Sequence, residues 1–159
     1  MHFYLLLLLS LFVTNLDAQS KIYLKDYYSS GQLKSEGWMQ DELKQDYWIF
    51  YHSNGHKSAQ GSYDQGEKSG YWFFYNEHEK LIKEGHYQKD QEEGWWTFYD
   101  LAAQKESRCQ CRDNLKHGYC LIYEKGRLKR VDHYHKGQKI RTWSTLSAFR
   151  KDNPEVKFR

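Results

Sequence analysis

The residues best suited to chemistry in this chain are three cysteines and a histidine. Cys109, Cys111 and Cys120 lie close together in the sequence, and His117 falls among them. Three thiolates and an imidazole form a ligand set that zinc accepts, although this spacing is not that of a standard zinc knuckle. Thiols that reach an oxidising compartment form disulfides instead. We therefore expect one disulfide, from Cys120 to Cys109 or Cys111, and neither a metal nor another cofactor.

The other reactive side chains do not form a catalytic set. His133-x-His135 would lie on one face of a strand, but no third ligand is apparent, so we expect surface histidines. The acidic pairs Asp41-Glu42 and Glu92-Glu93 are expected in turns, where they keep a sheet soluble. The chain has no G-x-S-x-G elbow, Walker loop, H-E-x-x-H or dinucleotide fingerprint. We expect no catalytic residues, and hence a protein that is not an enzyme.

A 24-residue repeat determines the elements that must position these side chains. The segment "YWIFYHSNGHKSAQGSYDQGEKSG" (47–70) aligns without a gap on 71–94 and then on 95–118. The aligned columns are Tyr27, Tyr51, Tyr75, Tyr99 and Tyr123; Trp48, Trp72 and Trp96; Phe50, Phe74 and Phe98, continued by Ile122; Gly37, Gly61 and Gly85; and Gly70, Gly94 and Gly118. About five units cover Tyr23 to Trp143, with degenerate terminal units that are typical of a repeat array.

Each unit predicts a β-hairpin. A ring-rich segment such as "YWFFY" has high β-propensity. A polar turn follows, in which Asn54-Gly55 is typical of a type I′ hairpin. The second strand carries Gly-x-Tyr, as in Gly61-Ser62-Tyr63, and the small residue leaves room for a neighbouring ring. Glycines recur too often for a helix. The predicted fold class is all-β: an elongated, single-layer antiparallel sheet of about five hairpin repeats.

This pattern resembles the MORN repeat, in a slightly longer bacterial variant described as antitoxin-like. The resemblance rests on the aromatic-aromatic-x-[Phe/Tyr]-Tyr segment, the turn, and Gly-x-Tyr-x-x-Gly-x-x-x-Gly, and it covers about residues 23–143. The chain departs from the pattern at Glu79 and Ala103, where the hairpin Gly is lost, and at the three cysteines. The resemblance implies a twisted sheet of successive hairpins, curved into a trough that serves as a binding scaffold.

The rings are expected to divide between the two faces of the sheet. Alternate residues of a strand point to opposite faces, and we expect the Trp48 and Phe50 columns to form the compact face. The other face would be an aromatic trough and the candidate binding site. Its residues are Tyr47, Tyr71, Trp95, Tyr119, Trp143, Tyr51, Tyr75 and Tyr99. The alternative is that every ring serves packing and the protein is a spacer.

The two ends of the chain differ from the repeats. Residues 1–18 read as a signal peptide, because an apolar run from Phe3 to Val13 ends near the small residue Ala18. Residues 19–143 would form the repeat domain, and 144–159 a basic C-terminal cap or tail with a short helix from Ser144. We therefore expect an exported protein, periplasmic, in the outer envelope or secreted.

Charge and repeat type together suggest the kind of partner. The net charge of +3 is too small to imply nucleic acid, yet residues 124–159 carry 11 Lys and Arg against 4 acids, or +7, which leaves −4 for the rest. The basic end suits an anionic membrane surface. We expect a non-catalytic scaffold that binds an unknown protein or envelope component through an aromatic concave face. The alternatives are a cell-wall choline- or glycan-binding repeat, to which "WIFYHSNGHKSAQGSY" is similar, and an antitoxin-like neutraliser of a partner protein.

Overall fold

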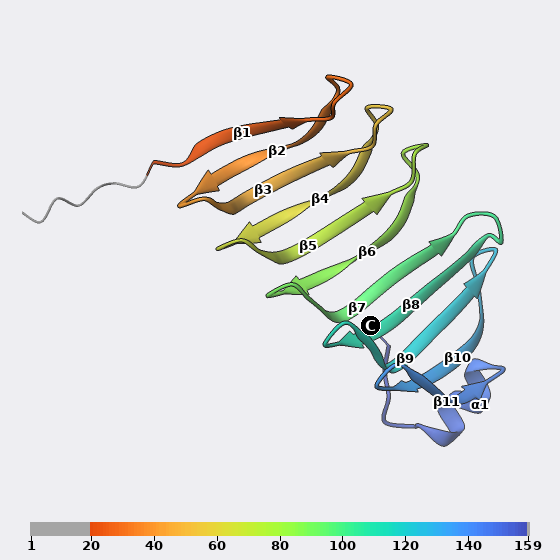
Figure 1. Ribbon diagram of the computed structural model, residues 1–159. Coiled ribbons are helices and arrows are strands. Elements are labelled where there is room, and N and C mark those ends of the chain that lie inside the picture. The colour runs from red at the N-terminus through yellow and green to blue at the C-terminus, as the bar shows by residue number, and fades with distance from the viewer. Residues whose placement is uncertain (1–19, 159) are drawn as a thin grey trace, which may run out of the picture.

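The computed structural model describes residues 20–158 as one open antiparallel sheet with a short helix at its end (Figure 1). The expected signal peptide, residues 1–18, lies outside the described residues. The strands are β1 (Ile22–Tyr27), β2 (Leu33–Gln40), β3 (Leu43–Tyr51), β4 (Lys57–Asp64), β5 (Glu67–Tyr75), β6 (Leu81–Gln88), β7 (Gln91–Asp100), β8 (Lys105–Arg112), β9 (Leu115–Glu124), β10 (Arg127–His135) and β11 (Gln138–Trp143), and the helix is α1 (Leu146–Asp152).

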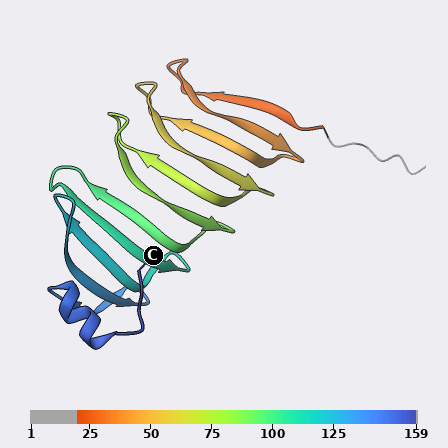
Figure 2. The ribbon, with the colours of Figure 1, turned by 180° about the vertical axis from the view of Figure 1, so that it is seen from behind.

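The order of the strands in the sheet is their order in the chain, so the fold is a meander of hairpins. The predicted fold class is confirmed. The ring-rich strands β3, β5, β7 and β9 begin at Leu43, Glu67, Gln91 and Leu115, which keeps the 24-residue interval of the sequence. The interval is lost at β10 and β11, where the repeat also degenerates. Viewed from either side the sheet is elongated and twisted (Figures 1 and 2).

Turns of two kinds alternate along the sheet. One edge has two-residue turns such as Asp113-Asn114, where both residues have positive φ, as a type I′ hairpin requires. At the opposite edge the first four connections are longer, and only Lys125-Gly126 is a two-residue turn. There Gly55 has positive φ but Asn54 does not, so the predicted type I′ turn at this dipeptide is wrong. The reason is loop length: Tyr51 pairs with Lys57, and the five-residue connection closes with a single left-handed residue at Gly55.

Each tryptophan of the 24-residue column is seated on a glycine of the preceding strand. Trp72 pairs with Gly85, while a Cβ added to Gly61 would come within 2.5 Å of three Trp72 ring atoms. The Trp72 indole also donates a hydrogen bond from Nε1 to the carbonyl oxygen of Ser62 at 3.0 Å. The Trp48 and Trp96 rings repeat this arrangement over Gly37 and Gly85. All three tryptophans are buried, as predicted for the compact face.

The C-terminal end adds a second layer over part of one face. Helix α1 begins after Thr145, whose side-chain oxygen accepts a hydrogen bond from the Ala148 amide. It ends at Asp152, and Asn153 caps it just before Pro154. The short helix predicted for this segment is therefore present, with its start slightly later than Ser144. Its buried residue, Phe149, packs with Leu121, Val131 and Trp143. Helix α1 and the residues after it form a cap on the last strands (Figure 2).

Candidate binding face

The two faces of the sheet carry different rings. We call one the tryptophan face; it holds Trp48, Phe50, Tyr63, Trp72, Phe74, Tyr87, Trp96 and Phe98. On it, rings of successive strands touch one another, as where Tyr87 meets Trp96 edge-on at 4.9 Å between centroids. Such edge-to-face pairs add stability beyond the burial of their area. This face is the hydrophobic core of a sheet that has no second layer along most of its length.

Lysine side chains cover the tryptophan face. The Lys44 ammonium lies 4.7, 4.8 and 5.2 Å from the ring centroids of Trp48, Phe50 and Tyr63. Its partial burial, reinforced by the charge of Lys68, lowers the pKa of Lys44. Lys68, Lys83 and Lys116 are placed over rings in the same way further along the sheet. The aliphatic stems shield the rings from water while the charges stay at the surface.

One acidic pair has a structural role on this face. Glu92 and Glu93 were predicted in a turn, but both lie in β7, because the two-residue turn at 89–90 ends before them. Glu92 forms an ion pair with Lys83 and takes the place that Lys44 and Lys68 have in their repeats. Asp41 and Glu42 do occupy a turn, as predicted.

The opposite face, the tyrosine face, has a column of rings that occurs once in each repeat. Tyr23, Tyr47, Tyr71 and Trp95 are exposed to almost the same degree, at 48%, 46%, 47% and 40%. We call these four side chains the open rungs. Tyr23 belongs to the same 24-residue column as the predicted trough residues, and the sequence analysis missed it because it precedes the first complete repeat. Evenly exposed rings at a fixed interval provide a regular apolar surface.

A second column on the tyrosine face is held by hydrogen bonds. The Tyr51 hydroxyl donates to Glu36 Oε1 at 2.7 Å, and the Tyr99 hydroxyl donates to Glu84 Oε1 at 2.6 Å. Gln60 takes the place of the glutamate in the repeat between them, and its amide donates to the Tyr75 hydroxyl at 2.9 Å. Burial, with the hydrogen bond to Glu36, raises the pKa of Tyr51 to about 12. These tyrosines are half-buried and fixed in orientation, so they form the floor beside the open rungs.

The last two rungs of the column are covered. Tyr119 meets Phe149 edge-on at 5.1 Å, and Trp143 meets the same ring at 5.1 Å. Trp143 is buried, so it does not line an open surface as the sequence suggested. Tyr119 is half-buried beneath the cap, and its hydroxyl donates to Asn153 Oδ1 at 3.1 Å. Of the predicted trough residues, Tyr47, Tyr71 and Trp95 are therefore open, while Tyr119 and Trp143 lie under the chain's own C-terminus.

The cysteines are divided between a disulfide and a buried thiol. Cys120 forms a disulfide with Cys109, one of its two expected partners, across the paired strands β8 and β9. Cys111 is free and buried, and burial raises its pKa to about 11. His117 lies apart from the disulfide, beside His135. In the described part of the chain, no group of three His, Cys, Asp or Glu residues is arranged to hold a metal ion.

Three histidines gather beside the cap. The ring centroids of His117 and His135 are 5.1 Å apart, and the His133 ring lies tilted against Tyr119 at 4.7 Å. The sequence showed His133-x-His135 but not its neighbour His117, because that proximity depends on the register of β9 with β10. Burial lowers the pKa of His133, and the charges of the other two histidines lower it further. The three histidines lie at the edge of the covered rungs.

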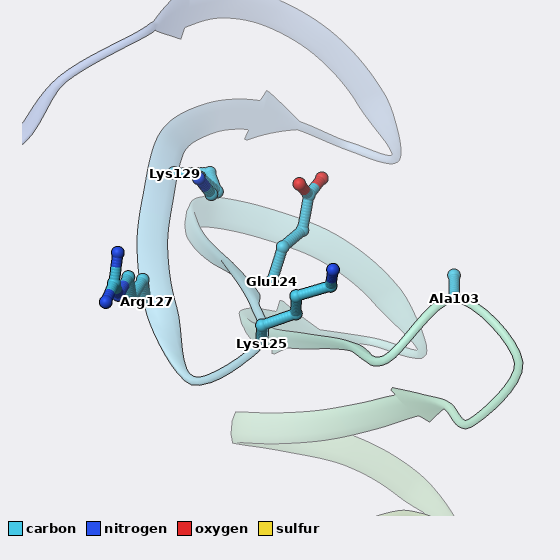
Figure 3. A pocket seen from close by; sticks show the side chains of 5 residues that line it. All are labelled: Ala103, Glu124, Lys125, Arg127 and Lys129. Carbon is cyan, nitrogen blue, oxygen red and sulfur yellow. The ribbon is translucent and has the colours of Figure 1, made fainter.

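A basic cavity lies at the hairpin ends of the C-terminal half (Figure 3). It measures about 480 Å³ and is lined by Ala103, Glu124, Lys125, Arg127 and Lys129. Figure 3 shows that Lys125 comes from the turn between β9 and β10, while Arg127 and Lys129 come from β10. Three cations against one carboxylate give this region a positive potential, which is the structural expression of the basic C-terminal sequence.

No family model matches the chain, and a search of curated proteins finds no match. Within residues 20–158, none of the helices has the length and apolar character to cross a membrane. The binding hypothesis therefore depends on the geometry of the tyrosine face.

Proposed function

We propose that this protein is a non-catalytic, exported repeat scaffold that binds a protein or envelope component through the open rungs of its tyrosine face. The proposal depends on a difference between the two ring-bearing faces: the rings of one are covered and those of the other are exposed. The tryptophan face is shielded by lysine stems, whereas four rings of one column on the other face keep 40–48% of their surface exposed. A regular row of exposed rings costs solubility, and such surfaces in soluble proteins are typically partner sites.

The basic C-terminal half supports a second contact within the same proposal. The cavity lined by Lys125, Arg127 and Lys129 provides clustered cations at the edge of the sheet. Cations near an anionic surface contribute about 1 kcal/mol each. An anionic membrane or envelope polymer would therefore hold the C-terminal end while the rungs bind their partner.

The choline-binding alternative is disfavoured by the lysines. A choline cage needs several rings around one cation. On the tryptophan face such a group of rings is formed by Trp48, Phe50 and Tyr63, and it already holds the Lys44 ammonium. A quaternary ammonium ligand would have to displace this cation, and both make the same attraction to the rings. The open rungs form a row and not a cage.

The proposal is tested by affinity capture from envelope extracts with residues 19–159 as bait. We expect a captured component whose amount falls at least tenfold with Tyr47→Ser/Tyr71→Ser. The matched control is Leu101→Ser, which removes an apolar side chain of similar exposure from a hairpin end. If both baits retain the component equally, or if neither captures one above background, the rungs are not a binding site.

A further inference from the structure

The cap shows what kind of segment the rungs accept. After α1, the chain from Asn153 to Phe158 runs back along the tyrosine face toward β7 in both views (Figures 1 and 2). The Phe158 ring lies 5.9 Å from that of Tyr119 and 6.1 Å from that of Trp95, edge-on to both. A peptide segment with an apolar side chain thus already crosses the strands and contacts successive rungs of the column.

Beyond Phe158 the tyrosine face continues toward the open rungs. A hollow of about 410 Å³ lies beside it. It is lined by Glu84, Trp95, Thr97, Tyr99, Arg108, Leu121, Tyr123 and Phe158. From Trp95 the column goes on to Tyr71, Tyr47 and Tyr23, each two strands from the last. The intramolecular contact and the open rungs therefore lie along one column of the same face.

The spacing of the rungs selects a backbone conformation. Neighbouring strands are about 4.8 Å apart, so rungs on every second strand are separated by roughly 9.6 Å. A polyproline II segment advances about 9.3 Å in one turn of three residues, so every third side chain points to the same side. Every third side chain of such a segment would meet one rung. Because the polyproline II helix forms no internal hydrogen bonds and is already extended, it loses little entropy on a ring-lined surface.

The charge of the tyrosine face indicates which residues of the partner segment would lie between the apolar side chains that contact the rungs. The cap comes from the basic part of the chain, with +7 over residues 124–159, whereas the four open rungs lie in the part that carries −4. Glu84 is fixed beside the rungs by the Tyr99 hydroxyl. Glu36, which the Tyr51 hydroxyl holds, is already paired with Lys25 at 3.3 Å. A basic partner segment would therefore be attracted to the same face as the cap.

We propose that the open rungs bind an extended, proline-rich partner segment with a bulky apolar side chain at every third position and Lys or Arg between, and that Phe158 competes with it for Trp95. This inference rests on the proposed function and names the chemistry of its partner. The cap would act as an intramolecular competitor at the fourth rung, while Tyr23, Tyr47 and Tyr71 stay free.

The test is binding of a fluorescein-labelled peptide of four Phe-Pro-Lys repeats to residues 19–159, followed by anisotropy. The control peptide has the same composition with the phenylalanines at irregular intervals, and we expect it to bind at least tenfold more weakly. Tyr47→Ser/Tyr71→Ser should weaken binding of the repeating peptide at least tenfold, a loss of about 1.4 kcal/mol. Tyr47→Phe/Tyr71→Phe should restore it, since the rings remain. Unfolding curves verify that each variant is folded.

Release of the cap provides an independent measurement. Phe158→Ser should raise the affinity for the repeating peptide at least threefold, whereas Glu155→Ser, an exposed change in the same segment, should leave it unaltered. Equal binding of the two peptides, or no response to Phe158→Ser, would overturn the inference. A third outcome is that the peptides do not bind, whereas chito- or cello-oligosaccharides bind saturably and Tyr47→Ser/Tyr71→Ser abolishes that binding. The partner would then be a glycan: the peptide inference would be wrong, and the proposed function would stand. Envelope capture that is indifferent to the rung variants would instead remove both.

Discussion

At the scale of single residues, the decisive contact is a tryptophan ring lying flat on a glycine. The three copies of this contact, at Trp48, Trp72 and Trp96, explain two columns of the repeat at once. The glycine is required by space and not by backbone conformation, since Gly37, Gly61 and Gly85 have no positive φ. In the other column, Gly70 and Gly94 have positive φ and open space around them. The two columns therefore predict different costs of substitution.

We expect Gly61→Ala to destabilise the protein by about 3 kcal/mol, the upper part of the usual range for overpacking. The added methyl would come within 2.5 Å of three Trp72 ring atoms that are themselves held between strands. The control is Gly94→Asn, which should cost only about 1 kcal/mol because Asn tolerates positive φ. Asp46 already occupies the equivalent position with φ 57°. Urea unfolding followed by tryptophan fluorescence measures both, and equal costs would contradict the packing explanation.

At the scale of elements, the β8–β9 hairpin is joined by a disulfide and leaves one thiol enclosed. Cys109 and Cys120 lie opposite each other in the ladder, and the free Cys111 is buried two residues away. We predict no reactive thiol in the native protein near neutral pH, one after denaturation, and three after denaturation with reductant. Reduction should cost roughly 3 kcal/mol of stability for a loop of this length. Two or more thiols in the unreduced, denatured chain, or equimolar zinc, would contradict the assignment.

The cap is the element whose stability should depend on pH. His133 lies between the Tyr119 and Trp143 rings. His117 and His135 are its basic neighbours, while Arg141, across the ladder, is paired with Asp152. The pKa of His133 is lowered below 6.5 in the folded protein, mainly by burial. As the pH falls through about 6.5, the unfolded chain takes up a proton that the native state does not, and stability decreases.

We expect the melting temperature to fall between about pH 7.5 and pH 5.5, the range in which an unfolded histidine becomes charged. His133→Gln should remove part of that fall, because the glutamine does not titrate. His78→Gln is the control, since His78 lies in the loop between β5 and β6, outside the cap. An unchanged pH dependence in His133→Gln would show that this histidine is not the responsible group.

At the scale of the whole molecule, the sequence predicts what repeats and fails where the repeat ends. The interval between strands and the burial of the tryptophan column follow from periodicity and ring size, because every unit solves the same packing problem. The covering of Trp143 does not follow, since it depends on where the chain turns after Asn153. The length of the connection around Gly55 depends on pairing across the hairpin, and the closeness of His117 to His135 depends on register. Such features join segments that periodicity treats separately.

Because the repeats are equivalent, the molecule should tolerate the removal of one complete unit. Because the order of strands in the sheet follows the chain, removal of residues 43–66 brings β2 beside β5 with every column preserved. Gly37 would then lie under Trp72, and Glu36 would replace Gln60 beside the Tyr75 hydroxyl, as it now serves Tyr51. The Asp41-Glu42 turn remains intact.

We therefore expect the shortened chain to be monomeric if the parent is, to keep its β-sheet circular dichroism, and to unfold cooperatively with reduced stability. Removal of residues 43–54 is the control, because it deletes β3 alone, places β4 beside β2 and leaves Gly37 without Trp48. Circular dichroism and thermal unfolding distinguish the two. Loss of folded structure in the full-unit deletion would mean that stability depends on contacts beyond neighbouring strands, and the sheet could not then be described as a sum of equivalent repeats.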